Sequence, residues 1–141
     1  MKGVGVSDAQ PPPPVVPRAR TVLVVSSDPL LLESCRAALA ELGWSMVARS
    51  ECADLAAVLA APPERALLLD VDQPPGSSAF VALRGLRSAG WSLPVVGVVG
   101  SGAVEDLVAL FRLGADEVLR KPARASELRA VFARLLPPSE P

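Results

Sequence analysis

Five short apolar runs recur along the chain, and each is bounded by polar or turn-forming residues. A continuous apolar run of this length is typical of a strand buried on both faces of a sheet. The first run, residues 21–25, is rich in β-branched side chains and ends at a pair of serines. The pattern therefore predicts a buried strand at residues 21–25 and further strands at residues 46–48, 66–69, 95–99 and 118–120.

Between these runs the apolar residues repeat at helical spacing. Asp28 followed by Pro29 forms an N-cap and a first helical position, and Leu32, Cys35 and Leu39 then recur three or four residues apart. The first helix should end at Leu42, because Gly43 follows it. The same reading predicts further helices at residues 54–60, 79–87, 104–113 and 126–136.

Regular alternation of five strands with five helices predicts a doubly wound α/β domain with a parallel sheet and helices on both of its faces. We expect this domain to span residues 21–136. Residues 1–20 are rich in proline, glycine and small polar groups and are expected to form a disordered tail, and residues 137–141 a second, short tail.

The charge balance narrows the classes of partner. Fourteen basic and fifteen acidic residues leave a net charge of -1, so nucleic-acid binding is not expected. No apolar run is long enough for a signal peptide or a membrane span, which favours a cytoplasmic protein without membrane insertion. Cys35 and Cys52 lack neighbours at metal-ligand spacing and are interpreted as small buried hydrophobes.

The chain contains no histidine, which removes the commonest general base and metal ligand. In a doubly wound sheet, ligands bind at the carboxyl ends of the strands. The predicted strands deliver Ser26, Ser27, Asp28, Asp70 and Lys121 to that edge. These five residues are the first candidates for a functional site.

The order of local motifs resembles the receiver domain of bacterial response regulators. The matches are Val-Val-x-x-Asp-Pro at the first turn, Leu-Leu-Leu-Asp before a Pro-Gly loop, Gly-Ala-Asp, and Lys-Pro followed by Glu-Leu. The resemblance implies strand order 2-1-3-4-5, a cis peptide bond before Pro122, and Asp70 as the residue that accepts a phosphoryl group from a partner histidine kinase.

The chain departs from that family at the positions that support phosphorylation. The resemblance implies an acidic pair that holds Mg²⁺, but Ser26 and Ser27 stand there. It also implies a hydroxyl residue and a switching aromatic residue where the chain has Val99 and Val118. Asp70 and Lys121 are therefore interpreted as an ion pair kept for geometry.

These departures predict a stand-alone pseudo-receiver, with no enzymatic activity, cofactor or metal, that acts through unidentified signalling proteins. One alternative is a working phosphoacceptor in which Asp28 or Asp72 supplies the missing carboxylate. A second alternative is a small phosphatase, because Asp70-Val71-Asp72 resembles the nucleophile motif of haloacid-dehalogenase-type enzymes. That motif expects a different residue at Pro74 and a later acidic cluster that the chain lacks.

The fourth predicted helix carries apolar residues around its whole circumference, which favours an interaction surface. The family resemblance assigns Val108 and Phe111 to the core. It also implies docking or homodimerisation through the fourth helix, fifth strand and fifth helix. The face expected from this carry-over comprises Val104, Leu107, Leu113, Glu117, Arg120 and Arg129.

Overall fold

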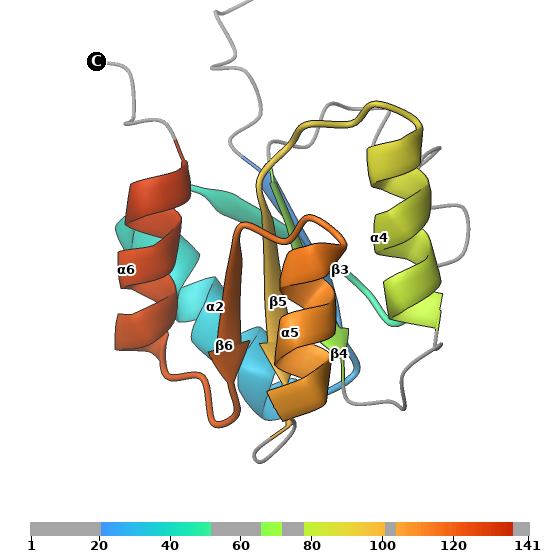
Figure 1. The fold of residues 1–141 in the computed structure, drawn as a ribbon. Helices are drawn as coiled ribbons and strands as arrows, with labels where there is room; N and C mark the ends of the chain where they lie inside the picture. The colour runs from blue at the N-terminus through green and yellow to red at the C-terminus, as the bar shows by residue number, and fades with distance from the viewer. Residues whose placement is uncertain (1–20, 52–65, 72–77, 101–103, 137–141) are drawn as a thin grey trace, which may run out of the picture.

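A computed structural model describes residues 21–51, 66–71, 78–100 and 104–136. Its elements carry the labels of Figure 1. The strands are β2 (Thr21–Val25), β3 (Ser45–Arg49), β4 (Ala66–Val71), β5 (Val95–Val99) and β6 (Glu117–Arg120). The helices are α2 (Pro29–Glu41), α4 (Ser78–Ser88), α5 (Val104–Arg112) and α6 (Ala125–Leu135).

The strands form one parallel sheet in the order β3-β2-β4-β5-β6. This is the predicted order 2-1-3-4-5, so the doubly wound architecture is confirmed. The helices α2 and α6 lie together on one face of the sheet, and α4 and α5 lie on the other (Figure 1). All five strands run in the same direction, which brings their carboxyl ends to a single edge.

Alternate residues of the central strands feed two separate hydrophobic cores. Val24, Leu68 and Val96 face α2 and α6, where the largest fully buried side chain is Phe132. Residues of the other parity, such as Leu69, pack against α4 and α5. Burial on both faces explains why the central strands are continuous apolar runs rather than alternating ones.

The predicted boundaries hold to within two residues. The strand β4 continues through Asp70 and Val71, because these residues pair with Val98 and Val99 of β5. The strand β3 is one residue longer at each end than predicted, since it pairs with all five residues of β2. The predicted helix at 54–60 and both predicted tails lie outside the described residues.

The orientation predicted for α5 is wrong. Leu110 is the fully buried residue of this helix, while Val108 and Phe111 are 40% and 47% exposed. Leu107 and Leu113, predicted to lie on the surface, are half-buried and pack against the core. The cause lies in β5, because Gly97 leaves the space that the Leu110 side chain occupies.

Gly97→Ala is expected to lower the free energy of unfolding by about 1–3 kcal/mol. An added Cβ would lie 2.6 Å from Cδ1 of Leu110, so the fully buried Leu110 side chain would have to shift within the core. Gly85→Ala is the control, because nothing lies within 4 Å of its added Cβ on the exposed side of α4. We expect that control to gain about 0.5–1 kcal/mol in urea denaturation. Equal effects of the two substitutions would contradict this packing argument.

Candidate functional site

Three side chains from separate segments meet at the carboxyl edge of the sheet. Ser26 follows β2, Asp70 lies near the end of β4, and Lys121 follows β6. The Ser26 hydroxyl donates a hydrogen bond of 2.6 Å to Oδ2 of Asp70. The Lys121 ammonium lies 3.0 Å from the same oxygen. The predicted ion pair between Asp70 and Lys121 is confirmed.

Asp28 completes this cluster from the start of α2. Its Oδ1 accepts hydrogen bonds from the backbone N–H groups of Leu30 and Leu31, so the predicted N-cap is confirmed. Its Oδ2 lies 3.0 Å from Nζ of Lys121. The capping residue is therefore also the second carboxylate of the crevice, a double role that the sequence interpretation had treated as alternatives.

The environment of Asp28 favours its ionised form. The hydrogen bond from Lys121 is the largest cause that lowers its pKa below the ordinary value of 3.8, against a smaller opposing effect of desolvation. A lowered native pKa means that the ionised carboxylate stabilises the fold above the ordinary value. This stabilisation is lost as the pH falls through the lowered native value.

Ser26 adds a neutral group to the cluster, between the Asp70 carboxylate and the backbone of Asp28. Its Oγ donates to Asp70 and accepts a hydrogen bond of 3.0 Å from the backbone N–H of Asp28. The Ser26 side chain is buried, whereas Ser27 is exposed. Ser26 is therefore hydrogen-bonded within the crevice, whereas Ser27 is exposed to solvent beside it in the chain.

The described residues do not fit a magnesium site. Mg²⁺ prefers octahedral oxygen ligands, including one or two carboxylates that are available to it. Here Asp28 and Asp70 both direct Oδ2 at the Lys121 ammonium, and Ser26 supplies only a hydroxyl. Within the described ranges no group of three or more His, Cys, Asp or Glu side chains is placed to hold a metal ion. Asp72 lies outside the described residues.

One oxygen of the cluster lacks a partner. Oδ1 of Asp70 is buried and accepts no hydrogen bond from any described residue. A buried carboxylate oxygen without a partner carries a desolvation cost, and it attracts a cation or a hydrogen-bond donor. This open acceptor is the feature of the crevice that most resembles a reactive site.

The remaining predicted pocket residues surround this cluster without adding polar groups. Val99 is fully buried at the end of β5, and Val118 is half-buried against the α4 and α5 core. The Lys121-Pro122 peptide bond is cis, as the resemblance implied. Pro122 also lines a shallow cavity of about 350 Å³ beside the start of α2.

The predicted interaction face is only partly assembled. Val104 and Arg120 are exposed, but Leu107 and Leu113 contribute to the core. Arg129 pairs with Glu41 of α2 at 3.3 Å, so it faces α2 rather than β6. Instead, Arg134 of α6 contacts β6 through Glu117, also at 3.3 Å. Leu107 and Leu113 are therefore less exposed than predicted, and the binding role of this face stays a prediction.

The sequence interpretation missed Arg87, which among the described residues outside the crevice makes the most side-chain hydrogen bonds. Its guanidinium donates to the backbone carbonyls of Gly114, Trp91 and Leu93. It also pairs with Asp116, whose carboxylate accepts a hydrogen bond from the backbone of Val95. The Gly-Ala-Asp motif is the one sequence signal for this arrangement, which fixes the end of α4 against the start of β6.

Cys35 is a buried residue of α2, as predicted, whereas Cys52 lies outside the described residues. Burial raises the pKa of the Cys35 thiol to about 12, and the Asp70 charge adds to that rise. In a Cys52→Ser background, we expect alkylation by iodoacetamide at about pH 8 to be at least a hundredfold slower in the native than in the urea-unfolded protein. Rapid native alkylation, followed by mass spectrometry, would contradict this burial.

The sheet order, the paired Asp70 and Lys121, and the cis bond before Pro122 together define a receiver-type α/β domain. No protein-family model matches the chain. The probable transcriptional regulatory protein TcrX of Mycobacterium tuberculosis is 33% identical over 81% of this chain and 50% of its own length. The response regulator MprA of Mycobacterium avium is also 33% identical, over 85% of this chain and 52% of its own length.

A solved structure agrees with these relatives. The receiver domain of NtrX from Brucella abortus has 25% sequence identity and a TM-score of 0.71, and the match covers 82% of this chain and 97% of that one. The chain therefore contains a receiver domain of the response-regulator family. It spans about half the length of the curated relatives it matches. None of the helices in the described part of the chain is long and apolar enough to span a membrane.

Proposed function

We propose that this receiver domain is a pseudo-receiver, which signals by contact with other proteins and without magnesium-dependent phosphorylation of Asp70. The observation that carries the proposal is the position of Lys121, whose ammonium bridges the carboxylates of Asp28 and Asp70 at 3.0 Å each. The Lys121 ammonium already neutralises negative charge on the two carboxylates that would otherwise attract Mg²⁺. Ser26 adds no further anion.

The absence of a hydroxyl relay supports the same proposal. Val99 and Val118 have no hydrogen-bond donor for a phosphoryl oxygen. A phosphoryl group on Asp70 would therefore gain no hydrogen bond from these two side chains through which to move β5 or β6. The domain is then a non-enzymatic cytoplasmic module whose output depends on its binding surfaces, including the exposed parts of α5, β6 and α6.

A working phosphoacceptor is the second candidate, and one observation favours it. The buried Oδ1 of Asp70 has no partner among the described residues, so it is open to a cation or to the phosphorus atom of a small phosphodonor. In that case a carboxylate from outside the described residues, such as Asp72, would have to complete the metal site.

The experiment is a calorimetric titration with MgCl₂, followed by incubation with Mg²⁺ and acetyl phosphate and measurement of the intact mass. We expect no saturable heat at millimolar Mg²⁺ and no gain of a phosphoryl group. Asp70→Asn is the matched control, since it removes the acceptor and keeps the side-chain shape. A phosphoryl adduct on the wild-type chain that is absent from Asp70→Asn would overturn the proposal.

A further inference from the structure

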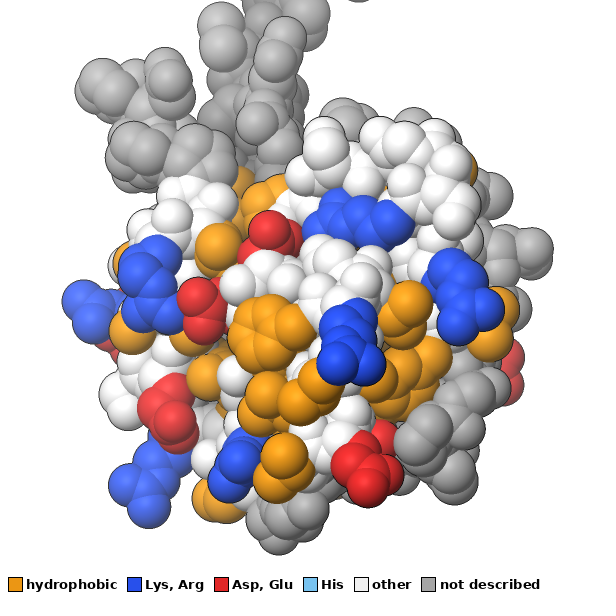
Figure 2. Space-filling view, viewed as in Figure 1, with side chains coloured by type: hydrophobic (Ala, Val, Ile, Leu, Met, Phe, Trp, Pro, Cys, Tyr) orange, Lys and Arg blue, Asp and Glu red, His pale blue; other side chains and the backbone are white. Residues whose placement is uncertain are grey.

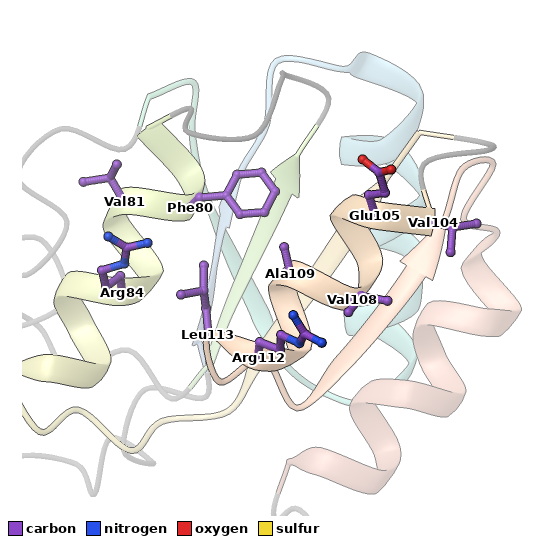
Figure 3. Close-up of a pocket in the computed structure, with 9 residues that line it drawn as sticks. All are labelled: Phe80, Val81, Arg84, Val104, Glu105, Val108, Ala109, Arg112 and Leu113. Carbon is purple, nitrogen blue, oxygen red and sulfur yellow. The ribbon is translucent and has the colours of Figure 1, made fainter.

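A groove of about 620 Å³ lies between α4 and α5, on the face of the sheet opposite α2 and α6 (Figure 3). Residues of both helices form its walls. Its lining consists of Phe80, Val81, Arg84, Val104, Glu105, Val108, Ala109, Arg112 and Leu113. None of these residues belongs to the crevice around Asp70, so the groove is a separate surface.

The walls expose apolar groups to solvent. Val81 is 61% exposed on α4, while Val104 and Val108 are 53% and 40% exposed on α5. In the space-filling view, hydrophobic side chains gather over α5 and continue toward α4 (Figure 2). A contiguous apolar surface rimmed by charge is typical of an interaction site, because its removal from water is favourable.

Two arginines give the groove a net positive charge. Arg84 projects from α4 and Arg112 from the end of α5, on opposite walls (Figure 3). Neither side chain makes a hydrogen bond or ion pair within the described ranges, in contrast to Arg87 one turn further along α4. The single acidic residue of the lining, Glu105, lies at the opposite end of α5 from Arg112. The groove therefore complements an apolar partner that carries carboxylates.

We propose that the groove between α4 and α5 binds an amphipathic helix of a partner protein. Its apolar face would lie between Val81 and Val108, and its carboxylates would pair with Arg84 and Arg112. A channel between two helices matches the helix-in-groove mode, in which apolar anchors recur at helical spacing along one face. This inference rests on the proposed function, because it gives the contact-based output a binding surface and a partner chemistry.

The probes are two synthetic helical peptides with the same leucine stripe, one flanked by glutamates and the other by lysines. Each is titrated into the full-length ¹⁵N-labelled chain, and amide chemical shifts report the binding surface. We expect the glutamate peptide to shift resonances of α4 and α5, and to bind at least about tenfold more tightly than the lysine peptide. Equal affinities, no binding by either peptide, or shifts confined to other elements would overturn the proposal.

Arg84→Glu/Arg112→Glu tests the charge pairing directly. Both arginines are exposed, so the fold should persist. We expect this variant to lose about tenfold in affinity for the glutamate peptide and to gain affinity for the lysine peptide. Arg36→Glu/Arg49→Glu is the matched control, since it changes the net charge equally at exposed positions outside the groove lining. Equal losses of affinity for the glutamate peptide in both double variants would show that only the net charge of the chain matters, and would overturn the proposal.

Two further measurements distinguish self-association from partner binding, and failure of this proposal from failure of the proposed function. Concentration-dependent shifts of the same α4 and α5 resonances without peptide would identify a second copy of the chain as the occupant and overturn the partner assignment. Repeating the titration with Mg²⁺ and beryllofluoride tests the proposed function independently. A mimic bound at Asp70 would contradict the pseudo-receiver proposal, while a glutamate-selective groove would still stand.

Discussion

Lys121→Met is expected to lower the free energy of unfolding by about 3 kcal/mol at about pH 7. The Lys121 ammonium lies between Asp28 and Asp70, and the Asp70 side chain is only 6% exposed. Methionine keeps the apolar part of the side chain but removes the cation, so it leaves a buried carboxylate without its counter-charge. Urea denaturation followed by circular dichroism measures this loss.

The double variant Asp70→Asn/Lys121→Met is the control, because it removes both charges of the buried pair. We expect it to recover most of the stability that the single substitution loses, which would give a coupling energy of about 1–3 kcal/mol in the double-mutant cycle. A loss below about 1 kcal/mol in Lys121→Met would show that the pair is no stronger than an exposed ion pair.

The pH dependence of the same variant follows from Asp28. The hydrogen bond from Lys121 is the largest cause of the lowered pKa of Asp28, so its removal should raise that pKa toward 3.8. The stability advantage of the wild-type chain over Lys121→Met should therefore be fully present above about pH 4 and should shrink as the pH falls through the lowered pKa of Asp28. If the unfolding free energies of the two proteins instead converged only at higher pH, Lys121 would not be the cause of the lowered pKa of Asp28.

Ser26→Asp/Ser27→Asp is expected to make the stability of the domain depend on Mg²⁺. Without metal, an added carboxylate at the buried position 26 faces Asp70 directly and should destabilise the fold. With Mg²⁺ the enlarged set of anions becomes a usable site. Saturation at about a hundred times the dissociation constant should then restore about 2.7 kcal/mol. Thermal unfolding with and without MgCl₂ measures the difference.

Ser45→Asp/Ser92→Asp adds the same charge elsewhere and is the matched control. Ser45 starts β3 and Ser92 precedes β5, so both exposed residues lie at the amino edge of the sheet, away from the crevice. Neither this control nor the wild-type chain should be stabilised by Mg²⁺ beyond the effect of NaCl at equal ionic strength. Specific stabilisation of the wild-type chain would indicate that it already holds a metal site.

The central strands could be predicted from the sequence because burial on both faces makes each a continuous apolar run, whereas the strand order was implied by the family resemblance. Residues 21–25 and 95–99 show such a run most clearly, as every position in both strands is buried. The carboxyl end of β4 was harder to predict, since the sequence places Asp70 at the start of a loop, whereas it lies inside a paired strand. Pairing between distant strands determined that boundary, and no local signal encodes it.

The residues of the site were predicted from the sequence, but some of the hydrogen bonds between them were not. The pairing of Asp70 with Lys121 followed from the strand order, whereas the use of one Asp28 oxygen for the helix and the other for Lys121 depends on three-dimensional geometry. The rotation of α5 also lay beyond the sequence pattern. Apolar residues surround that helix, so the inward face is chosen by the space above Gly97 and not by periodicity.

Arg87 has a consequence for recognition between α4 and α5. Its guanidinium joins the end of α4 to the carbonyl of Gly114 just beyond α5, at 2.8 and 3.1 Å, and to the loop that leads into β5. The two helices are thus held at a set separation before any partner arrives. A ligand that docks between them gains affinity from this preorganisation, because little conformational entropy is lost on association.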